Sequence, residues 1–457
     1  MWAATQGLRH LILAMTLLTA TIGAFEALLF SMLGSVVDWL AKVPPNQLWA
    51  TQKQHLLLLA GILLASPLLI WLQALCKYQG MAGNFPMRLR WNFHRHLLGQ
   101  SMSFYQDEFA GRVSAKVMQT ALAVRDTVLT LTDIMVFVLI YFVTMTAVVG
   151  NFDLSLMLPF LGWLVLYGCT LWFFVPRLGK ASKAQADARS LMTGRITDAY
   201  TNISTVKLFS QGQREAGFTK AAMQEFIATV YRQMRLVSGF EVVNHTLSML
   251  LIASTAGVTL WLWVQGTVGV GAVAAATAMA LRLNGISHWV MWEMSNLFEQ
   301  IGTVQDGIST LARPIAIIDA SDAKPLQVSH GEIRFEDVSF AYGGQRKVIE
   351  HLSLTIRPGE KIGLVGRSGA GKSTLVNLLL RFYDVEHGRI LIDGQDVAHV
   401  TQDSLRQQVG MVTQDTSLLH RSVRDNLIYG HPDASDEQMI AAAQRAEAHD
   451  FILNLAD

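Results

Sequence analysis

The sequence has few charged residues, few cysteines and almost no net charge. Charged residues make up 16% of the chain and hydrophobic residues 51%, whereas an average soluble domain has about 25% charged residues. A net charge of +1 gives no electrostatic sign of a nucleic-acid partner. Both cysteines, Cys76 and Cys169, lie in apolar runs, so neither a disulfide framework nor a zinc site is predicted. The composition favours a membrane protein.

The apolar surplus is uneven along the chain. It lies in residues 1 to about 300, whereas the sequence from Asp319 onward has the mixed polar character of a soluble domain. We therefore predict an α-helical membrane domain over residues 1–311, a linker over residues 312–330 and a soluble domain over residues 331–457.

Six segments are long enough to cross a bilayer as helices, which takes roughly 20 apolar residues for about 30 Å. The first could instead be the apolar core of a signal peptide, but its apolar character continues through residue 37 and five more spans follow. The predicted spans lie near residues 11–40, 56–76, 128–149, 154–175, 247–264 and 272–292.

The distribution of basic residues predicts the orientation of the spans. The two long loops, residues 77–127 and 177–245, contain seven and ten Lys or Arg residues, whereas the short loops on the other side contain only Lys42 and Lys53. Basic loops stay on the cytoplasmic side. The long loops, the N-terminus and the soluble domain are therefore expected in the cytosol. Both long loops have few helix breakers, so we expect the spanning helices to extend beyond the lipid.

Four ionisable residues lie at predicted membrane depth, where charges are costly and usually face a cavity or a partner. One interpretation places them near helix ends or in a water-filled vestibule. Another is that Arg282 and Glu293, three helical turns apart, line a solute path near Trp289 and Trp292. The four residues are Glu26, Asp133, Arg282 and Glu293.

The soluble part contains a glycine-rich loop between a predicted strand and a predicted helix. Strand-like alternation over residues 333–342 and 348–356, followed by KIGLVG over residues 361–366, leads into GRSGAGKST at residues 366–374, and a helix is expected over residues 372–382. Strand, glycine loop and helix in this order are the context of a P-loop. The alternative, a glycine-rich turn that binds nothing, does not account for this order.

The residue types in the loop suit a triphosphate. Gly366, Gly369 and Gly371 lack a Cβ, so the backbone can adopt positive φ values and turn its amides toward phosphate oxygens. Lys372 can reach the β- and γ-phosphates and Ser373 can ligate Mg²⁺. The following helix directs the positive end of its dipole at the anion. A nucleotide site is therefore predicted.

Two spacings narrow the class of nucleotide-binding protein. Tyr342 lies 24 residues before Gly366 at a strand end, where its ring could stack on adenine. Gln414 lies 42 residues after Lys372, after the apolar strand expected at VGMV, residues 409–412, where its side chain could meet magnesium and the attacking water. Alone, the first could be an ordinary strand-end aromatic and the second a solvated loop residue; with the P-loop they indicate an ATP site.

These features resemble an ATP-binding cassette (ABC) exporter half-transporter of the multidrug or lipid A exporter type. The resemblance rests on FAY, GRSGAGKST, VTQDTSLLHRSVRDNLIYG and, in the two long loops, FYQDEFAGR and TDAYTNISTVKLFSQGQRE. It implies a six-helix membrane domain fused to a partial α/β P-loop domain, with ATP and Mg²⁺ as cofactors and a homodimeric or heterodimeric partner in a bacterial inner membrane. The substrates it implies are amphiphilic drugs, lipids or peptides. The implied nucleotide-binding residues are Tyr342, Gly366, Arg367, Ser368, Gly369, Ala370, Gly371, Lys372, Ser373 and Thr374, with Ser373 and Gln414 as Mg²⁺ ligands and Gln414 and Lys372 as catalytic residues.

The resemblance also implies motifs that these 457 residues do not contain, namely an LSGGQ-type signature, a Walker B strand with its carboxylates and a switch histidine. On this basis the sequence is expected to be cut within the nucleotide-binding domain. Since carboxylates hold the metal and orient water in phosphoryl transfer, we expect ATP binding without hydrolysis. The alternative function is a silent membrane protein that binds nucleotide or modulates an intact partner, and an importer subunit is a third, less favoured option.

Overall fold

The structure, a computed structural model, describes residues 5–108, 110–343, 347–413 and 417–455. The chain divides into two compact units. One consists of Met1–Leu98 with Ala110–Arg313, and the other of Gly99–Phe109 with Pro314–Asp457.

The first unit is helical. Six stretches of 34 to 53 residues are long and apolar enough to cross a membrane, which confirms the six predicted spans. All exceed the roughly 20 residues that a bilayer requires, so the helices extend beyond the lipid as expected. The helices are α1 (Arg9–Lys42), α2 (Leu48–Ala74), η2 (Leu75–Ala82), α3 (Asn84–Leu98), α5 (Ala110–Leu129), η3 (Thr130–Ile134), α6 (Met135–Phe152), η4 (Leu154–Leu156), α7 (Met157–Thr201), α8 (Ile203–Leu208), α9 (Gly212–Val264) and α10 (Val270–Leu311).

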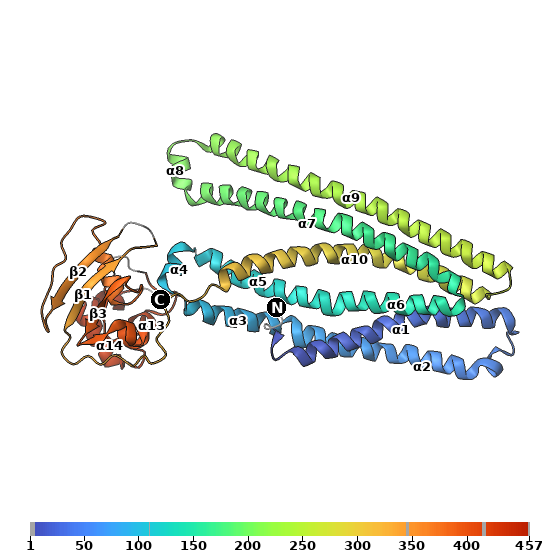
Figure 1. Cartoon of the computed structure of the whole chain (residues 1–457), viewed down its shortest axis with the longest axis horizontal. Helices are drawn as coiled ribbons and strands as arrows, with labels where there is room; N and C mark the ends of the chain where they lie inside the picture. Colours follow the sequence, from blue (N-terminus) through green and yellow to red (C-terminus); the bar gives the residue numbers. More distant parts are fainter. Residues whose placement is uncertain (1–4, 109, 344–346, 414–416, 456–457) are drawn as a thin grey trace. The chain divides into compact units, whose positions relative to one another are not determined.

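The helices pack as an antiparallel bundle. The two longest, α7 and α9, run side by side and are joined at one end by the short α8 (Figure 1). The core contains fully buried side chains from α6, α7, α9 and α10, among them Tyr141, Phe160, Phe240 and Met279. Because no aqueous phase drives helices together within lipid, close packing of this kind has to hold the bundle.

Helices α1 and α10 approach each other backbone to backbone. A Cβ built on Gly271 would lie 1.9 Å from the carbonyl oxygen of Gly34. Asp38 of α1 also accepts a hydrogen bond from the Gly271 amide at 2.8 Å, which satisfies an N–H group in the first turn of α10. Small residues at both positions therefore allow this crossing.

Two π-helical segments meet in the bundle. The carboxylate of Asp133, in η3, accepts hydrogen bonds from Thr19, from Gln73 at 2.9 Å and from Lys77, in η2, at 2.7 Å. Asp133 is only 4% exposed. Of the four ionisable residues singled out in the sequence, this one is thus a buried ion-pair partner that joins α1, α2 and η3.

The second unit contains a four-stranded antiparallel sheet with strand order β2-β1-β3-β4. Its core is formed by Leu326, Phe335, Val338, Leu378 and Ile390 with neighbouring apolar side chains. The elements are α4 (Met102–Asp107), β1 (Ile333–Phe340), β2 (Ile349–Ile356), α11 (Lys372–Leu379), β3 (His387–Ile392), β4 (Gln395–Asp396), η5 (Val397–His399), α12 (Gln402–Gln407), α13 (Val423–Leu427), α14 (Asp436–Arg445) and α15 (His449–Leu453).

The strands predicted at residues 333–342 and 348–356 are confirmed as β1 and β2, whereas those expected at 361–366 and 409–412 form no strand. Most of their apolar side chains are exposed, above all Val365 at 99% and Val412 at 98%, although Val409 packs against the core. An apolar run becomes a strand only when a neighbouring backbone completes its hydrogen-bond ladder. In the described part of the chain these two runs have no such neighbour, so hydrophobicity alone predicted them wrongly.

Candidate functional site

The glycine-rich loop leads directly into α11. Gly369 and Gly371 adopt φ values of +82° and +87°, which side chains with a Cβ rarely tolerate. Gly371 is the residue before the first turn of α11. Gly366 does not have a positive φ, contrary to expectation; it is instead a close approach, because a Cβ there would lie 3.2 Å from the Cβ of Ala370. Two of the three glycines therefore shape the turn itself.

The lysine of the loop folds back over it. The Lys372 ammonium donates hydrogen bonds to the carbonyl oxygens of Gly366 at 2.8 Å and Arg367 at 3.0 Å. These contacts hold a positive charge across the loop at the N-terminal end of α11, where the helix dipole also favours an anion. The arrangement suits a phosphate group, which is a stronger acceptor than a carbonyl oxygen.

Tyr342 lies beside Thr374, at the end of the glycine-rich loop sequence. Its hydroxyl hydrogen-bonds to the hydroxyl of Thr374 at 3.1 Å. Its ring packs edge-on against Phe340 and against Tyr383, with centroids 4.9 and 5.0 Å away. The side chain is 43% exposed, so the two aromatic neighbours fix the ring next to α11 while part of it remains open to a ligand.

The structure describes one of the two residues that were predicted to ligate Mg²⁺. Ser373 is exposed in the first turn of α11, and Gln414 lies outside the described residues. No group of three or more His, Cys, Asp or Glu side chains that could hold a metal ion occurs in the part of the chain that the structure describes. This donor set fits Mg²⁺ that is held mainly by nucleotide phosphates, waters and one hydroxyl, since Mg²⁺ keeps several waters and seldom needs an all-protein cage.

The first, helical unit contains a cavity of about 500 Å³ between α1, α2 and α10. Its walls are mostly apolar, with Phe25 and Phe30 among them, and Glu26 and Arg282 also line it. These two form an ion pair at 3.0 Å and are both partly exposed. Arg282 thus has its ion-pair partner on α1, and Glu293 does not line this cavity.

Comparison with known proteins identifies the family. A model of the ABC transporter transmembrane region matches residues 12–286, and a model of the ABC transporter domain matches residues 349–456. The chain belongs to the ABC transporter family. The recognised resemblance is thereby confirmed.

This ABC transporter chain is similar in sequence to proteins of two bacteria. It is 57% identical over 457 residues to an "Uncharacterized ABC transporter ATP-binding protein" of Haemophilus influenzae, covering 100% of the chain and 74% of the relative. It is 30% identical over 369 residues to a "Putative multidrug export ATP-binding/permease protein" of Staphylococcus aureus, covering 80% of the chain and 64% of that protein.

Among solved structures, the ABC transporter chain resembles a bacterial Atm1-family ABC exporter with ATP bound, at a TM-score of 0.82 and 25% identity, covering 98% of the chain and 79% of the exporter. The six-span exporter fold is therefore established. The chain spans between 64% and 79% of the length of these relatives.

Sequence reasoning missed two residues near the site of this ABC transporter. Tyr383 supports the Tyr342 ring, and Arg381 is a nearly buried arginine directly after α11. A charged residue at the end of an apolar helix is a weak signal, because in most cases such a residue is solvated. Only the structure shows that Arg381 is surrounded by acceptors.

Proposed function

We propose that this chain provides the membrane-spanning part and the ATP-binding loop of an ATP-driven exporter. The observation that carries the proposal is the convergence of the turn at Gly369 and Gly371, the Lys372 ammonium and the Tyr342 ring on the start of α11. The relative solved with ATP bound and the relatives named as multidrug export proteins support it.

Each residue has a defined part in this proposal. The amides of residues 366–371 and the Lys372 ammonium bind the phosphates, with Lys372 exchanging its carbonyl acceptors for phosphate oxygens. Ser373 ligates Mg²⁺, and Tyr342 stacks on the adenine. Gln414 contacts the metal and the water. ATP supplies the free energy, and these side chains bind and orient it.

Coupling to the membrane is proposed to run through the first long loop. The segment Gly99–Phe109, which contains α4, clusters with Pro314–Asp457 in one compact unit. In the chain this segment connects α3 to α5, so a rearrangement of the nucleotide unit acts on the ends of both helices. In this proposal, residues 105–115 of the first long loop and residues 193–209 of the second transmit movement between the nucleotide-binding domain and the spanning helices. Nucleotide shifts the equilibrium by binding one conformation better than the other.

The proposed substrates are amphiphiles. The cavity between α1, α2 and α10 combines aromatic and aliphatic walls with the Glu26–Arg282 ion pair, and ionisable residues at membrane depth often mark a solute path. We place the protein in a bacterial inner membrane with its nucleotide unit in the cytosol, working with a second half-transporter of the same or another kind.

A second candidate is a membrane protein that binds nucleotide without hydrolysing it. The turn at Gly369 and Gly371 and the Lys372 ammonium are groups suited to bind phosphate, and binding is all that this candidate requires. Phosphate release by the purified chain distinguishes the two candidate functions. ATP hydrolysis that is lost in Gln414→Ala supports the exporter ATPase, whereas ATP binding without hydrolysis supports the second candidate.

The nucleotide site itself is tested by binding of a fluorescent ATP analogue to the detergent-purified chain. Lys372→Ala removes a charge-assisted contact of about 1.5–3 kcal/mol, so we expect affinity to fall by ten-fold or more. Lys361→Ala is the matched control, because Lys361 is an exposed lysine just before the loop and should leave affinity unchanged. Equal affinities of Lys372→Ala and the unaltered chain would remove the loop from the proposed site.

A further inference from the structure

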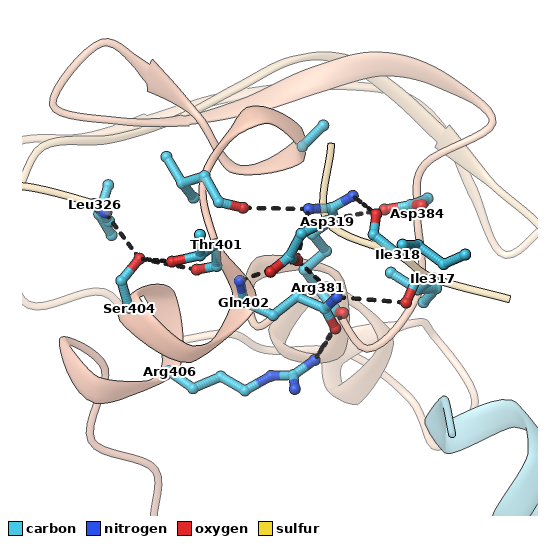
Figure 2. A network of polar contacts seen from close by, with 12 residues as sticks. Ile317, Ile318, Asp319, Leu326, Arg381, Asp384, Thr401, Gln402, Ser404 and Arg406 are labelled. Carbon is cyan, nitrogen blue, oxygen red and sulfur yellow. Dashed lines mark hydrogen bonds and ion pairs between the residues drawn. The ribbon is translucent and has the colours of Figure 1, made fainter. Parts of the chain in front are cut away.

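A polar network attaches the linker to the end of the P-loop helix. Figure 2 shows Arg381, which follows α11, pointing into the space between the linker and the start of α12. The residue is 5% exposed. Its guanidinium donates to Asp384 at 2.9 Å, to the carbonyl oxygen of Val400 at 3.3 Å and to that of Ile318 at 3.3 Å. It also lies 3.8 Å from the carboxylate of Asp319.

The first turn of α12 holds the same stretch of linker. The backbone N–H and side-chain amide of Gln402 both donate to Asp319, at 3.2 and 2.9 Å, and the amide also reaches the carbonyl oxygen of Ile317. The side-chain oxygen Oε1 of Gln402 accepts from Arg406 at 2.9 Å, and Arg406 also donates to the backbone carbonyl oxygen of Arg381. Linker, α12 and the end of α11 are therefore one hydrogen-bonded assembly.

The attachment continues further along the linker. Lys324 pairs with Val400 in a parallel bridge, and its carbonyl oxygen accepts from the Thr401 amide at 3.1 Å. The Leu326 amide donates to the hydroxyl of Ser404 at 2.8 Å (Figure 2). The linker is thus ordered by contacts to residues 400–404. The side chains of Arg381 and Arg406 join this arrangement to the end of α11, and of the two only Arg381 contacts the linker directly in the hydrogen bonds given above.

We propose that Arg381 is a positioning residue that couples occupation of the P-loop to the order of the linker over residues 314–326. Helix α11 has eight residues, with Lys372 at its start and Arg381 two residues beyond its end. A helix of this length is about 12 Å long, and it moves as one body. A shift of its first turn onto a phosphate therefore moves the guanidinium that holds Ile318 and Asp319.

This proposal rests on the proposed nucleotide site, and it adds a reciprocal consequence. If nucleotide stabilises the linker contacts, then these contacts must raise nucleotide affinity by the same factor. Lysine retains the charge of Arg381 but lacks the planar fork that reaches Asp384, Val400 and Ile318 together. Arg381→Lys should therefore weaken both effects to the same extent.

The test is hydrogen exchange followed by mass spectrometry on the 457-residue chain in detergent, with and without saturating Mg²⁺-ATP. In the unaltered chain, we expect ATP to slow exchange of peptides covering residues 314–326 by five-fold or more. In Arg381→Lys we expect this ATP effect to disappear and ATP affinity to fall by a similar factor. Arg389→Lys is the matched control, since Arg389 pairs with Glu336 on the exposed surface of the sheet and should behave as the unaltered chain.

A second variant and the choice of readout distinguish coupling through Arg381 from a role of Arg381 in stability alone. Gln402→Ala removes linker contacts without touching Arg381 and carries the test if Arg381→Lys does not fold; it should at least halve the ATP effect on residues 314–326. ATP-dependent protection that persists in full in the folded variants would overturn the proposal, even if their melting temperatures fell. If the unaltered chain binds no ATP, the proposed nucleotide site fails as well; if it binds ATP and the linker does not respond, only the coupling fails.

Discussion

Replacing Asp133 by alanine tests whether the paired π-helical segments hold the membrane bundle together. The carboxylate has three donors and is 4% exposed, and the Lys77 side chain is only 26% exposed. Removing one partner of a buried pair costs about 3–5 kcal/mol, because the other charge stays desolvated. Since Lys77 retains some access to solvent, we take the lower value of about 3 kcal/mol. At about 2–4 °C per kcal/mol this corresponds to a fall of about 6–12 °C in the unfolding midpoint.

Tryptophan fluorescence during heating in detergent is a suitable assay, since all eleven tryptophans lie at or before position 292 and report on the first unit. Asp126→Ala is the control: this carboxylate pairs with Arg125 and is 36% exposed, so its loss should cost less than about 1 kcal/mol. Combining Asp133→Leu with Lys77→Met leaves no unpaired charge and should recover part of the loss. A shift below 2 °C in Asp133→Ala, or a double variant no better than the single one, would refute the reasoning.

Two further predictions concern close packing and pH. In Gly271→Ala the new Cβ meets the backbone of Gly34, so α1 and α10 must separate, and we expect the free energy of unfolding to fall by about 1–3 kcal/mol in a thermal-unfolding assay. The control is Gly285→Ala in the same helix, where a Cβ meets nothing within 4 Å and stability should not change. Equal effects of the two variants would contradict the packing argument. The backbone amides of His330 and Gly331, with those of Ser329 and Glu332, hold the pKa of Asp393 well below its usual range. Because the pKa is lowered in the folded state, the stabilisation is present above the unfolded value of about 3.9 and is lost as pH falls below it. The difference between the unaltered chain and Asp393→Asn in exchange protection factors of residues 329–332 should therefore be largest at pH 5–7 and shrink toward pH 2; a difference independent of pH would exclude this cause.

The six spans and the P-loop could be predicted from the sequence because each depends on neighbouring residues. Apolar length determines whether a helix can cross a bilayer, and the glycine spacing before Lys372 determines the turn. The strands expected at 361–366 and 409–412 were wrong because a strand depends on a partner elsewhere in the chain. Local pattern therefore predicted correctly the helices, which satisfy their own hydrogen bonds, and the strands β1 and β2, which pair with each other. It failed for the two runs that have no partner strand among the described residues.

The partners of the charged residues could not be predicted for a related reason. Lys77 and Asp133 are 56 residues apart, and Glu26 and Arg282 are 256 apart. Along a single helix Arg282 has Glu293 on the same face, which led to the expectation of a shared path. The bundle brings α1 nearer to Arg282, and at membrane depth the nearest opposite charge reduces the cost of the ion most.

The same physical distinction separates the two attachments made by charged residues in this chain. Asp133 joins three helices in a setting with little water, where losing one partner leaves a costly charge, so its role should appear mainly in stability. Arg381 donates hydrogen bonds to two backbone carbonyl oxygens and one carboxylate, and it follows the helix whose first turn forms the proposed ligand site. Its guanidinium can therefore change acceptors as the helix moves without leaving a charge unpaired. A residue with this choice of acceptors is suited to carry a conformational signal. Substitution of Arg381 should therefore remove the response to ATP without a matching loss of stability. For substitution of Asp133, the loss of stability should be the main effect.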